Sequence, residues 1–391
     1  MRVSEIMLGK GFGGAERTFV DLVVSLVEAG HQVQAILEPR GAAYRKLHDY
    51  AASLAVSQGG ARLDPSGVDQ VDAREADDCA RGMMTLTPVR VRGAWDVWAA
   101  AMIRRSLARF GPEIVHGHLA RGSHLGGRAA RALRIPMVSK LHNDVKLHYY
   151  RHVDHFQVTT AHQRQYLLDH GVEGHRVTQI PNFSRTPPRV DDHLGMWGSA
   201  AVEHGGEPRP LTMVGLGRLV HKKGFDVVLE ALARLRVRNP RLTFELAGDG
   251  PERASLEERC ALLGLRDAVV FHGWVDDVAE FLDRGDLFVL PSRDEPFGIV
   301  VIEAMARALP IIATRTDGPL EILDCSCAWL CDFDNVTDLE RALAAALESS
   351  DERVARAKTA CERYRLRYHV DVVVPRLVDW YGEVIAASRA R

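Results

Sequence analysis

The chain has 391 residues, 46% of them hydrophobic and 26% charged, which is the composition of a globular protein. A single core seldom grows beyond about 300 residues, so the length predicts two domains. No stretch approaches the roughly 18 apolar residues of a membrane-spanning helix, and the N-terminus lacks the pattern of a signal peptide. Six cysteines in so long a chain do not indicate a disulfide scaffold. We therefore expect a cytoplasmic protein.

The net charge of −2 conceals an uneven distribution. Residues 1–185 carry 24 Lys and Arg against 18 Asp and Glu, whereas the remainder carries 26 against 34. The segment 101–150 is the most basic, with nine basic residues against two acids. The resulting positive potential favours an anionic partner, for example a phosphorylated saccharide or a membrane surface. A solvated helix face with no partner would explain the basic residues about as well. We expect no nucleic-acid partner.

The N-terminal segment is predicted to be a strand over 2–8, a glycine-rich loop, a helix and a second strand. Gly9, Gly11 and Gly14 match G-x-G-x-x-G, and Glu38 ends the second strand, as in dinucleotide-binding domains. An NAD-dependent oxidoreductase is therefore one hypothesis. The pattern is weak, because any tight turn that lets a ligand approach the backbone needs such glycines.

Later strands of the first half end in polar side chains. His116 and His118 end one predicted strand. His142 follows the next strand, and Asn182 follows the last one. Strand–helix alternation predicts a parallel sheet, whose ligands bind beyond the carboxyl ends of the strands. A single histidine is more often structural, but the shared position favours a binding site. No H-e-x-x-H spacing is present, so we predict no metal site.

Two segments of the first half are less regular. Residues 58–94 show no clear periodicity, and we expect irregular structure or a loop region there. The helix that follows carries Trp98 and Met102 together with Arg104 and Arg105. It could rest at a membrane interface, but an outer layer of an α/β domain is the favoured interpretation.

Residues 184–210 are rich in Pro, Asp and Gly and are predicted to be a linker. Strand–helix alternation then restarts, which predicts a second parallel sheet. We expect an N-terminal domain over 1–185, a linker over 186–209, a C-terminal domain over 210–369 and a last helix over 370–391 that crosses back to the first domain.

The most informative stretch follows a predicted strand at 287–290. Pro296 and Gly298 suit the first turn of a helix, with Glu295 in the loop before it and Glu303 inside it. Such a helix presents free backbone N–H groups to an anion. Its two carboxylates can accept hydrogen bonds from the vicinal hydroxyls of a ribose and a hexose. The stretch therefore indicates a nucleotide sugar, although on its own a buried helix with incidental glutamates is equally compatible.

A nucleoside diphosphate needs positive charge. Arg218 and Lys223 lie in a glycine-bordered loop after the first strand of the second half and can supply it. The D-x-D sequence Asp332-Phe333-Asp334 follows the last strand of that domain and is predicted to be a solvated turn. We expect neither a metal nor another cofactor.

Six short motifs follow one another along the chain: Gly13-Gly14-Ala15-Glu16-Arg17, Ile114-Val115-His116-Gly117-His118, Ile180-Pro181-Asn182, Gly217-Arg218 with Lys223-Gly224, Gly248-Asp249-Gly250-Pro251, and Glu295-Pro296-Phe297-Gly298 with Glu303-Ala304. In this set and this order the chain resembles the retaining GT-B glycosyltransferases of the family-4 type, the glycosyl transferases group 1. Each motif is only moderately specific, but the ordered set covers nearly the whole chain. The resemblance implies an α/β fold of two Rossmann-like parallel-sheet domains that face each other across a cleft.

The resemblance also implies roles for these residues. Arg218 and Lys223 would grip the diphosphate, and Glu303 would bind the ribose. Glu295 and His118 would contact hydroxyls of the donor sugar. The implied catalytic residues are Arg218, Lys223, Glu295 and His118; the donor-binding residues are Gly13, Gly14, Gly217, Phe297, Gly298, Ile299 and Glu303; the acceptor or cleft residues are Glu16, Arg17, His116, His142 and Asn182.

The implied reaction moves a hexose from a nucleoside-diphosphate sugar, with UDP as one candidate, to a hydroxyl with retention. The acceptor would be a saccharide or a lipid-linked saccharide in bacterial lipopolysaccharide, polysaccharide or glycolipid synthesis, and the enzyme would be cytoplasmic or peripheral on the inner face of the membrane. The alternatives are the oxidoreductase, which leaves Arg218 and Lys223 unexplained, a GT-B sugar-nucleotide epimerase, and a non-catalytic sugar- or lipid-binding protein.

Overall fold

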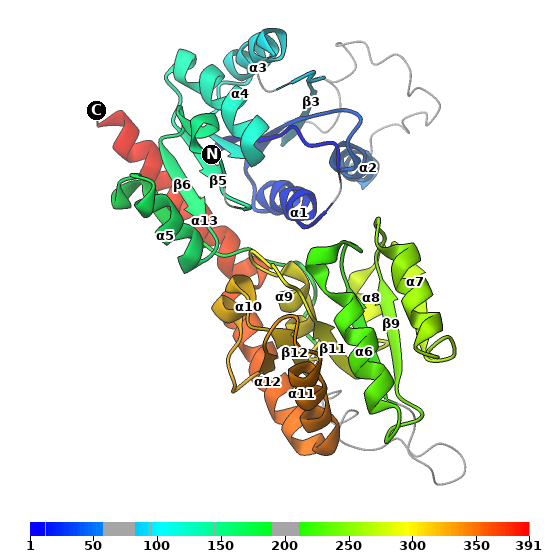
Figure 1. The fold of residues 1–391 in the computed structure, drawn as a ribbon. Helices are drawn as coiled ribbons and strands as arrows, with labels where there is room; N and C mark the ends of the chain where they lie inside the picture. The colour runs from blue at the N-terminus through cyan, green and yellow to red at the C-terminus, as the bar shows by residue number, and fades with distance from the viewer. Residues whose placement is uncertain (12, 58–82, 94–95, 144, 190–210, 391) are drawn as a thin grey trace. The chain divides into compact units, whose positions relative to one another are not determined.

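A computed structural model describes residues 1–11, 13–57, 83–93, 96–143, 145–189 and 211–390 (Figure 1). The chain divides into two compact units. Unit 1 consists of Met1–Asn182 together with Val373–Arg391, and unit 2 consists of Phe183–Val372. The C-terminal helix therefore belongs to the same unit as the N-terminus, as predicted. No helix of the described residues is long and apolar enough to cross a bilayer.

Unit 1 is built on a seven-stranded parallel sheet in the order β3-β2-β1-β4-β5-β6-β7. The strands are β1 (Arg2–Met7), β2 (Gln32–Leu37), β3 (Met84–Pro88), β4 (Ile114–His118), β5 (Met137–Lys140), β6 (His155–Val158) and β7 (Val177–Gln179). The helices are α1 (Gly14–Glu28), α2 (Ala42–Ser57), α3 (Val97–Phe110), α4 (Leu119–Leu133), α5 (Ala161–Asp169) and α13 (Val370–Arg389).

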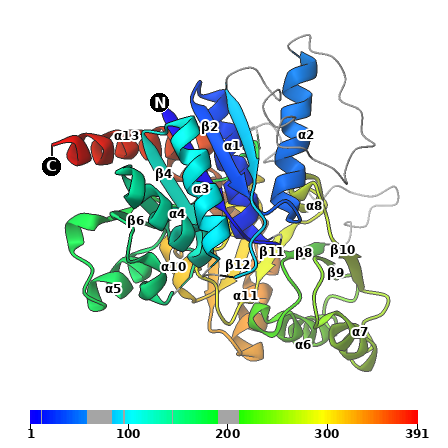
Figure 2. The ribbon, with the colours of Figure 1, turned by 90° about the horizontal axis from the view of Figure 1, so that it is seen from above.

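Alternation along β1 and β4 sends side chains to opposite faces of this sheet. Ile6 of β1 packs with Leu125 of α4 in the core of one face. Glu5 of β1 pairs in register with His116 of β4, and both point to the other face, where they meet Tyr381 of α13. Figure 2 shows α3 and α4 lying next to each other on unit 1.

Strand β3 corrects one prediction. It pairs in parallel with β2 from Val33↔Met84 to Leu37↔Pro88, so part of the segment 58–94 is a regular edge strand, not irregular structure. The sequence did not predict this strand because it has only five residues and lies in a segment without clear periodicity. Residues 58–82 lie outside the described part of the chain, and so does most of the predicted linker, from 190 to 210.

Unit 2 contains a six-stranded parallel sheet in the order β10-β9-β8-β11-β12-β13. The strands are β8 (Thr212–Leu216), β9 (Thr243–Ala247), β10 (Val269–Gly273), β11 (Leu287–Leu290), β12 (Ile311–Thr314) and β13 (Trp329–Cys331). The helices are α6 (Phe225–Leu235), α7 (Arg253–Leu262), α8 (Val278–Leu282), α9 (Ile299–Ala306), α10 (Asp317–Ile322), α11 (Val336–Glu348) and α12 (Ser350–Arg367). The strand order of this sheet reverses between β8 and β11. In open α/β sheets ligands bind at such a switch point, so the loops after these two strands are expected to form the binding site. Two parallel Rossmann-like sheets confirm the predicted fold class.

Candidate active site

The loops after β8, β9 and β11 pack on one another closely enough to require glycine. A Cβ atom on Gly248 would lie 1.8 Å from the carbonyl oxygen of Gly217, and one on Gly224 would lie 2.1 Å from that of Pro291. Both glycines also have positive φ, +125° and +66°. These contacts draw the basic loop after β8 against the turn that leads from β11 into α9.

Arg293 ties the same two loops together. Its guanidinium donates two hydrogen bonds, of 2.9 and 2.7 Å, to the carboxylate of Asp226 at the start of α6, and a third of 2.6 Å to the carbonyl of His221. Burial alone would raise the pKa of Asp226, but the bonds from Arg293 outweigh it and lower that pKa. The sequence analysis missed this brace, because Arg293 lay in a predicted turn and its partner is 67 positions away.

Lys223 and Glu295 meet within this frame. The Lys223 ammonium forms a direct ion pair with the Glu295 carboxylate, and both side chains are largely buried. The hydroxyl of Ser292 lies 3.4 Å from the same carboxylate oxygen. Arg218, two residues beyond β8, is exposed, and its guanidinium forms no hydrogen bond or ion pair with the described residues, so it is available to a ligand. Arg218 and Lys223 therefore both lie in the loop after β8, at the switch point of the sheet.

The start of α9 differs in detail from the prediction. Gly298 has a φ of +95° and stands just before the helix, which begins at Ile299 rather than at Pro296. Phe297 is buried and packs against Tyr368, and the peptide of Glu295 is fixed by a 2.9 Å hydrogen bond from the Gly318 N–H to its carbonyl. The Val301 N–H donates to the Gly298 carbonyl over 2.9 Å, whereas the N–H groups of Ile299 and Val300, in the first turn of α9, have no carbonyl within the helix to bind and can serve an anion.

Glu303 lies inside α9, as predicted, and is buried. An ionised carboxylate surrounded by apolar side chains needs compensating hydrogen bonds or charges, so its position in an otherwise apolar helix is unusual for a purely structural residue. The carboxylates of Asp332 and Asp334 are each paired with an arginine. Asp332 forms a 2.9 Å ion pair with Arg315, and Asp334 pairs with Arg293.

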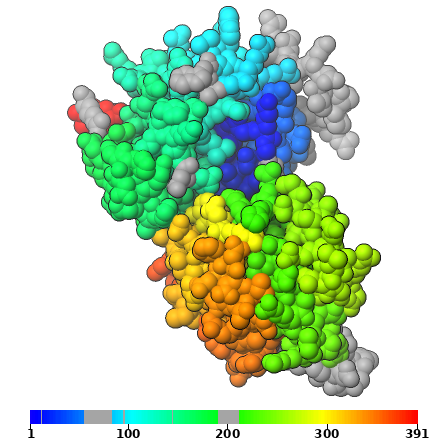
Figure 3. Space-filling model, viewed as in Figure 1, coloured from blue at the N-terminus to red at the C-terminus, as the bar shows by residue number. Residues whose placement is uncertain are grey.

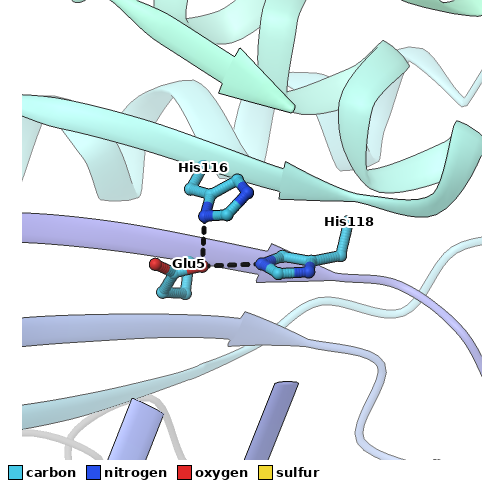
Figure 4. Close-up of side chains that lie close together, drawn as sticks. All are labelled: Glu5, His116 and His118. Atoms are coloured by element: carbon cyan, nitrogen blue, oxygen red, sulfur yellow. Dashed lines mark hydrogen bonds and ion pairs between the residues drawn. The ribbon is translucent and has the colours of Figure 1, made fainter. Parts of the chain in front are cut away.

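Two of the predicted histidines, His116 and His118, form a buried cluster with Glu5 (Figure 4). His118 Nε2 lies 2.8 Å from Glu5 Oε2, and His116 Nδ1 lies 3.4 Å from the same oxygen. Tyr381 donates to Glu5 Oε1 over 3.0 Å, so its oxygen accepts a hydrogen bond from His116 Nδ1 over 2.5 Å. His116 and His118 therefore come together, and α13 completes the cluster.

Burial and hydrogen bonding together set the charges of the groups in this cluster. It would raise the pKa of Glu5, but charge and hydrogen bonding from His116 and His118 outweigh it and hold that pKa at about 2. Burial lowers the pKa of His118 to about 3 and that of Lys140 to about 7. His118 is thus a neutral imidazole that donates from Nε2 to an ionised carboxylate. Its buried Nδ1 has no hydrogen-bond partner within the described ranges and can accept a hydrogen bond from a ligand hydroxyl.

Glu5, His116 and His118 also have the composition of a metal site, since their ligand atoms all lie within 4.8 Å of one another. The residues fit a cation poorly. The imidazole nitrogens nearest the carboxylate carry the protons of its hydrogen bonds, and the positive charge of Lys140 acts on the same buried group. We interpret the cluster as a hydrogen-bonded network between β1, β4 and α13.

The remaining predicted residues of unit 1 are more spread out. Glu16 accepts a 3.0 Å bond from the Gly13 N–H and caps α1, while Gly14 is exposed and Arg17 is half-buried. Asn182 is buried at the end of the unit. His142 lines a pocket of about 550 Å³ at the carboxyl ends of β1, β4 and β5. The pocket is lined by Leu8, Gly9, Lys10, Leu119, Ala120, Arg121, His142, Asn143, Val145, Tyr149 and Tyr150.

The dinucleotide interpretation finds no support at Glu38. This carboxylate is buried, is bound by Arg40 at 2.8 and 3.2 Å, and accepts a 3.0 Å bond from the Val91 N–H. Burial would raise its pKa, but these bonds lower it. Both oxygens are therefore engaged within the protein, and neither is free to bind a ribose.

Comparisons with known proteins decide the family. The family model "Glycosyltransferase Family 4" matches residues 12–184, and "Glycosyl transferases group 1" matches residues 202–363. The lipopolysaccharide core biosynthesis glycosyltransferase LpsE of Rhizobium meliloti (strain 1021) is 30% identical over 319 residues, which is 82% of this chain and 80% of that protein. The chain belongs to the family-4 glycosyltransferases. LpsD of the same organism, named for the same process, is 28% identical to this glycosyltransferase over 99% of both chains.

Solved structures share the fold of this glycosyltransferase. Anabaena Alr3699/HepE in complex with UDP has a TM-score of 0.78 at 16% identity, covering 98% of this chain and all of that one. WaaG, a glycosyltransferase involved in lipopolysaccharide biosynthesis, has a TM-score of 0.66 at 17% identity, covering 97% and 99%. The predicted GT-B fold is thereby confirmed, and the oxidoreductase alternative is not favoured.

Proposed function

We propose that this glycosyltransferase moves a hexose from a nucleoside-diphosphate sugar to a hydroxyl of a saccharide acceptor in the synthesis of a lipopolysaccharide core or a related envelope glycan. The relatives LpsE and LpsD carry lipopolysaccharide core biosynthesis in their names and support this acceptor class. The HepE structures with UDP and with UDP-glucose support a nucleotide sugar, with UDP as a first candidate for the nucleotide.

The observation that carries the proposal is the pairing of Lys223 with Glu295 at the switch point of unit 2, next to the exposed Arg218. An ammonium and a guanidinium at this place can neutralise a pyrophosphate and stabilise it as it departs. Once the phosphate shares the charge of Lys223, the Glu295 carboxylate is freer to accept hydrogen bonds from sugar hydroxyls. Glu303 would hold the ribose.

The proposed chemistry is transfer with retention. The bond between the anomeric carbon and the phosphate oxygen breaks, and the acceptor oxygen forms its bond on the same face. The proton of the acceptor hydroxyl passes to the departing phosphate. The chain then contributes positioning and charge stabilisation and forms no covalent intermediate. On this account His118, neutral at physiological pH, accepts a hydrogen bond from a sugar hydroxyl through Nδ1.

The reaction would need no metal ion. Asp332 and Asp334 are each paired with an arginine, and Arg218 and Lys223 supply the positive charge that a cation would otherwise bring. Glu16 and Arg17 at the start of α1, with His142 at the pocket, would serve the acceptor side, and Gly13 and Gly14 would let this loop approach the donor.

A panel of UDP-, GDP- and ADP-sugars tests the proposal. We expect release of one nucleoside diphosphate only when lipopolysaccharide core oligosaccharide is present, release that persists in EDTA, and an α-linked product from an α-linked donor by NMR. Release without an acceptor would favour hydrolysis or the epimerase alternative. A β-linked product would contradict retention, and loss of activity in EDTA that added metal restores would contradict the metal-free mechanism.

A further inference from the structure

The pocket at the carboxyl ends of β1, β4 and β5 carries positive charge that no carboxylate of the described residues neutralises. Lys10 is exposed and forms no hydrogen bond or ion pair with the part of the chain that the structure describes. Arg121 is half-buried, and its only bond to a described residue runs from Nη1 to the Leu8 carbonyl over 3.1 Å. That bond holds the guanidinium at the loop that carries Lys10, and none of the lining residues is acidic. The pocket therefore presents two cations to a ligand.

The start of α4 adds backbone donors to the same pocket. Leu119 and Ala120, its first two residues, line the pocket, and their N–H groups have no carbonyl within the helix to bind. The His118 side chain does not cap the helix, and the first turn contains no acidic residue. A helix of 15 residues that begins in this way attracts an anion. Leu119 also has a φ of +59°, a strained conformation for leucine of the kind that is concentrated at functional sites.

Two polar groups of the pocket are buried without a hydrogen-bond partner among the described residues. Tyr150 is 2% exposed, and its hydroxyl is one of them. The other is His142 Nε2. Burial, together with the positive charge of Lys140, lowers the pKa of His142 well below its usual 6.5, so this imidazole is neutral. A buried polar group without a partner costs free energy, so both groups are suited to bind hydroxyls of a ligand.

The size and lining of the pocket suit a sugar ring. Its volume of about 550 Å³ lies within the range of small-molecule sites and leaves room for one ring. The side chains of Leu8 and Val145 offer apolar surface to the faces of such a ring. In Figure 3 dark blue atoms from the N-terminal part of the chain reach the surface of unit 1 beside teal atoms from its middle. The pocket thus combines donors for an anion with groups that bind hydroxyls.

We infer that this pocket binds an acidic sugar residue of the acceptor, one that carries a carboxylate or a phosphate. Lys10, Arg121 and the first N–H groups of α4 hold the anion, while His142 and Tyr150 bind hydroxyls of the same ring. The inference rests on the proposed function, since it takes the acceptor to be the ligand of the pocket. The diphosphate of the donor has its own cations in the loop after β8, so those of unit 1 are left for the acceptor.

Calorimetric titration of the full chain with glucose, glucuronate and glucose 6-phosphate tests the inference. The three hexoses differ only at C6, which carries a hydroxyl, a carboxylate or a phosphate. We expect at least one charged hexose to bind about tenfold or more tightly than glucose. K10Q/R121Q should lower that affinity at least about tenfold, since even one hydrogen bond to a charged group contributes this much.

Matched variants separate the charge of the pocket from that of unit 1 as a whole. R134Q/R164Q removes two exposed arginines of unit 1 that do not line the pocket and should bind like the wild type. R121K keeps the charge and should bind the charged hexose more tightly than R121Q. Melting temperatures that match the wild type establish that the variants are folded. K10Q alone repeats the test if R121Q lowers the melting temperature, because the Lys10 side chain has no bond to a described residue to lose.

Three results would overturn the inference: no binding of any of the three hexoses, binding of glucose as tight as that of the charged ones, or equal binding by K10Q/R121Q. A preference between the two charged hexoses would support it and assign the anion. The titrations contain no nucleotide sugar, so they do not depend on the reaction. A chain that binds charged hexoses and transfers no sugar supports the site and contradicts the proposed function. Transfer to core oligosaccharide with an unchanged KM in K10Q/R121Q leaves the proposed function intact and overturns this inference.

Discussion

Lys223 and Glu295 are held in place by neighbouring residues, which can stay where they are when the sugar donor binds. Ser292 contacts the carboxylate, and Arg293 fixes the loop that carries the ammonium. A charge that is positioned before the donor arrives need not be reorganised during the reaction, which is what makes such groups effective in catalysis.

We therefore expect Lys223→Met to lower turnover by roughly two orders of magnitude, the usual cost of losing one charge-stabilising donor. Lys222→Met is the matched control. Its ammonium is more exposed and pairs with Asp294 at 3.3 Å, so turnover should stay within a few-fold of wild type. Initial rates of nucleoside-diphosphate release measure both. Equal effects of the two substitutions would remove the specific role of Lys223.

The cluster around Glu5 makes unit 1 sensitive to acid. The pKa of His118 is lowered from 6.5 to about 3, and that of Glu5 from 4.5 to about 2. In each case, at a pH between the two pKa values, the group is mainly protonated in the unfolded chain and mainly unprotonated in the folded chain. The stabilisation from Glu5 is complete above pH 4.5 and is lost as the pH falls toward 2. The penalty from neutral His118 grows as the pH falls from 6.5 toward 3, so both act in the same direction.

His118→Gln should remove the part of this pH dependence that lies between 6.5 and 4.5. One proton corresponds to a slope of about 1.4 kcal/mol per pH unit in the free energy of unfolding, and the slope should decrease by about that amount. Calorimetric unfolding at a series of pH values measures it. His175→Gln, at an exposed position, should leave the slope unchanged. An unaltered slope in His118→Gln would show that His118 is not held neutral.

The sequence predicted only some of the individual residues of the candidate site. Lys223, Glu295 and Glu303 were found because their spacing around a strand end has a chemical meaning. Arg293 and Tyr381 were missed, since their partners are 67 and 376 positions away and no local pattern marks such contacts.

At the scale of elements, the close packing of loops in unit 2 positions the basic residues. Gly224 separates Lys223 from α6 and touches the carbonyl of Pro291. Gly264 offers a comparison, because its φ of +69° is similar but nothing lies within 4 Å of the position that a Cβ would take.

Gly224→Ala should destabilise the chain by about 1–3 kcal/mol more than Gly264→Ala does, since both introduce strain but only the first also produces a clash. It should also weaken nucleoside-diphosphate binding, because Lys223 would move with the loop. Denaturant unfolding and calorimetric titration measure the two effects. Equal losses of stability would mean that the contact with Pro291 relaxes without cost.

Most elements were predictable because apolar periodicity and strand–helix alternation are local signals. Strand β3 was not, since an edge strand of five residues lies beside the stretch 58–82, whose composition shows no period. Helix α9 was placed three residues early, because Pro296 and Gly298 suit a first turn, yet the left-handed φ of Gly298 keeps it outside the helix.

At the scale of the whole molecule, the C-terminal helix completes unit 1. Tyr381 of α13 donates to Glu5 of β1, the first strand of the chain. Because these residues lie at opposite ends of the sequence, unit 1 can form its buried network only once the last residues are present.

Tyr381→Phe should therefore destabilise unit 1 by about 1.5–3 kcal/mol, the range for a hydrogen bond to a charged group. Denaturant unfolding followed by tryptophan emission, to which the neighbouring Trp380 contributes, measures it. Tyr149→Phe is the control, since the hydroxyl of Tyr149 has no partner among the residues described, and it should change stability little. Equal stability of the two variants would contradict the structural role of the network.

The account rests on unit 2 holding a nucleoside diphosphate through Arg218 and Lys223. Calorimetric titration of UDP, GDP and ADP in EDTA tests this claim most directly. One of the three should bind to the wild-type chain, and R218Q/K223Q should bind it at least about 100-fold more weakly, since two charge-assisted contacts are lost. Binding of none of them, or equal binding by the double variant, would contradict the account.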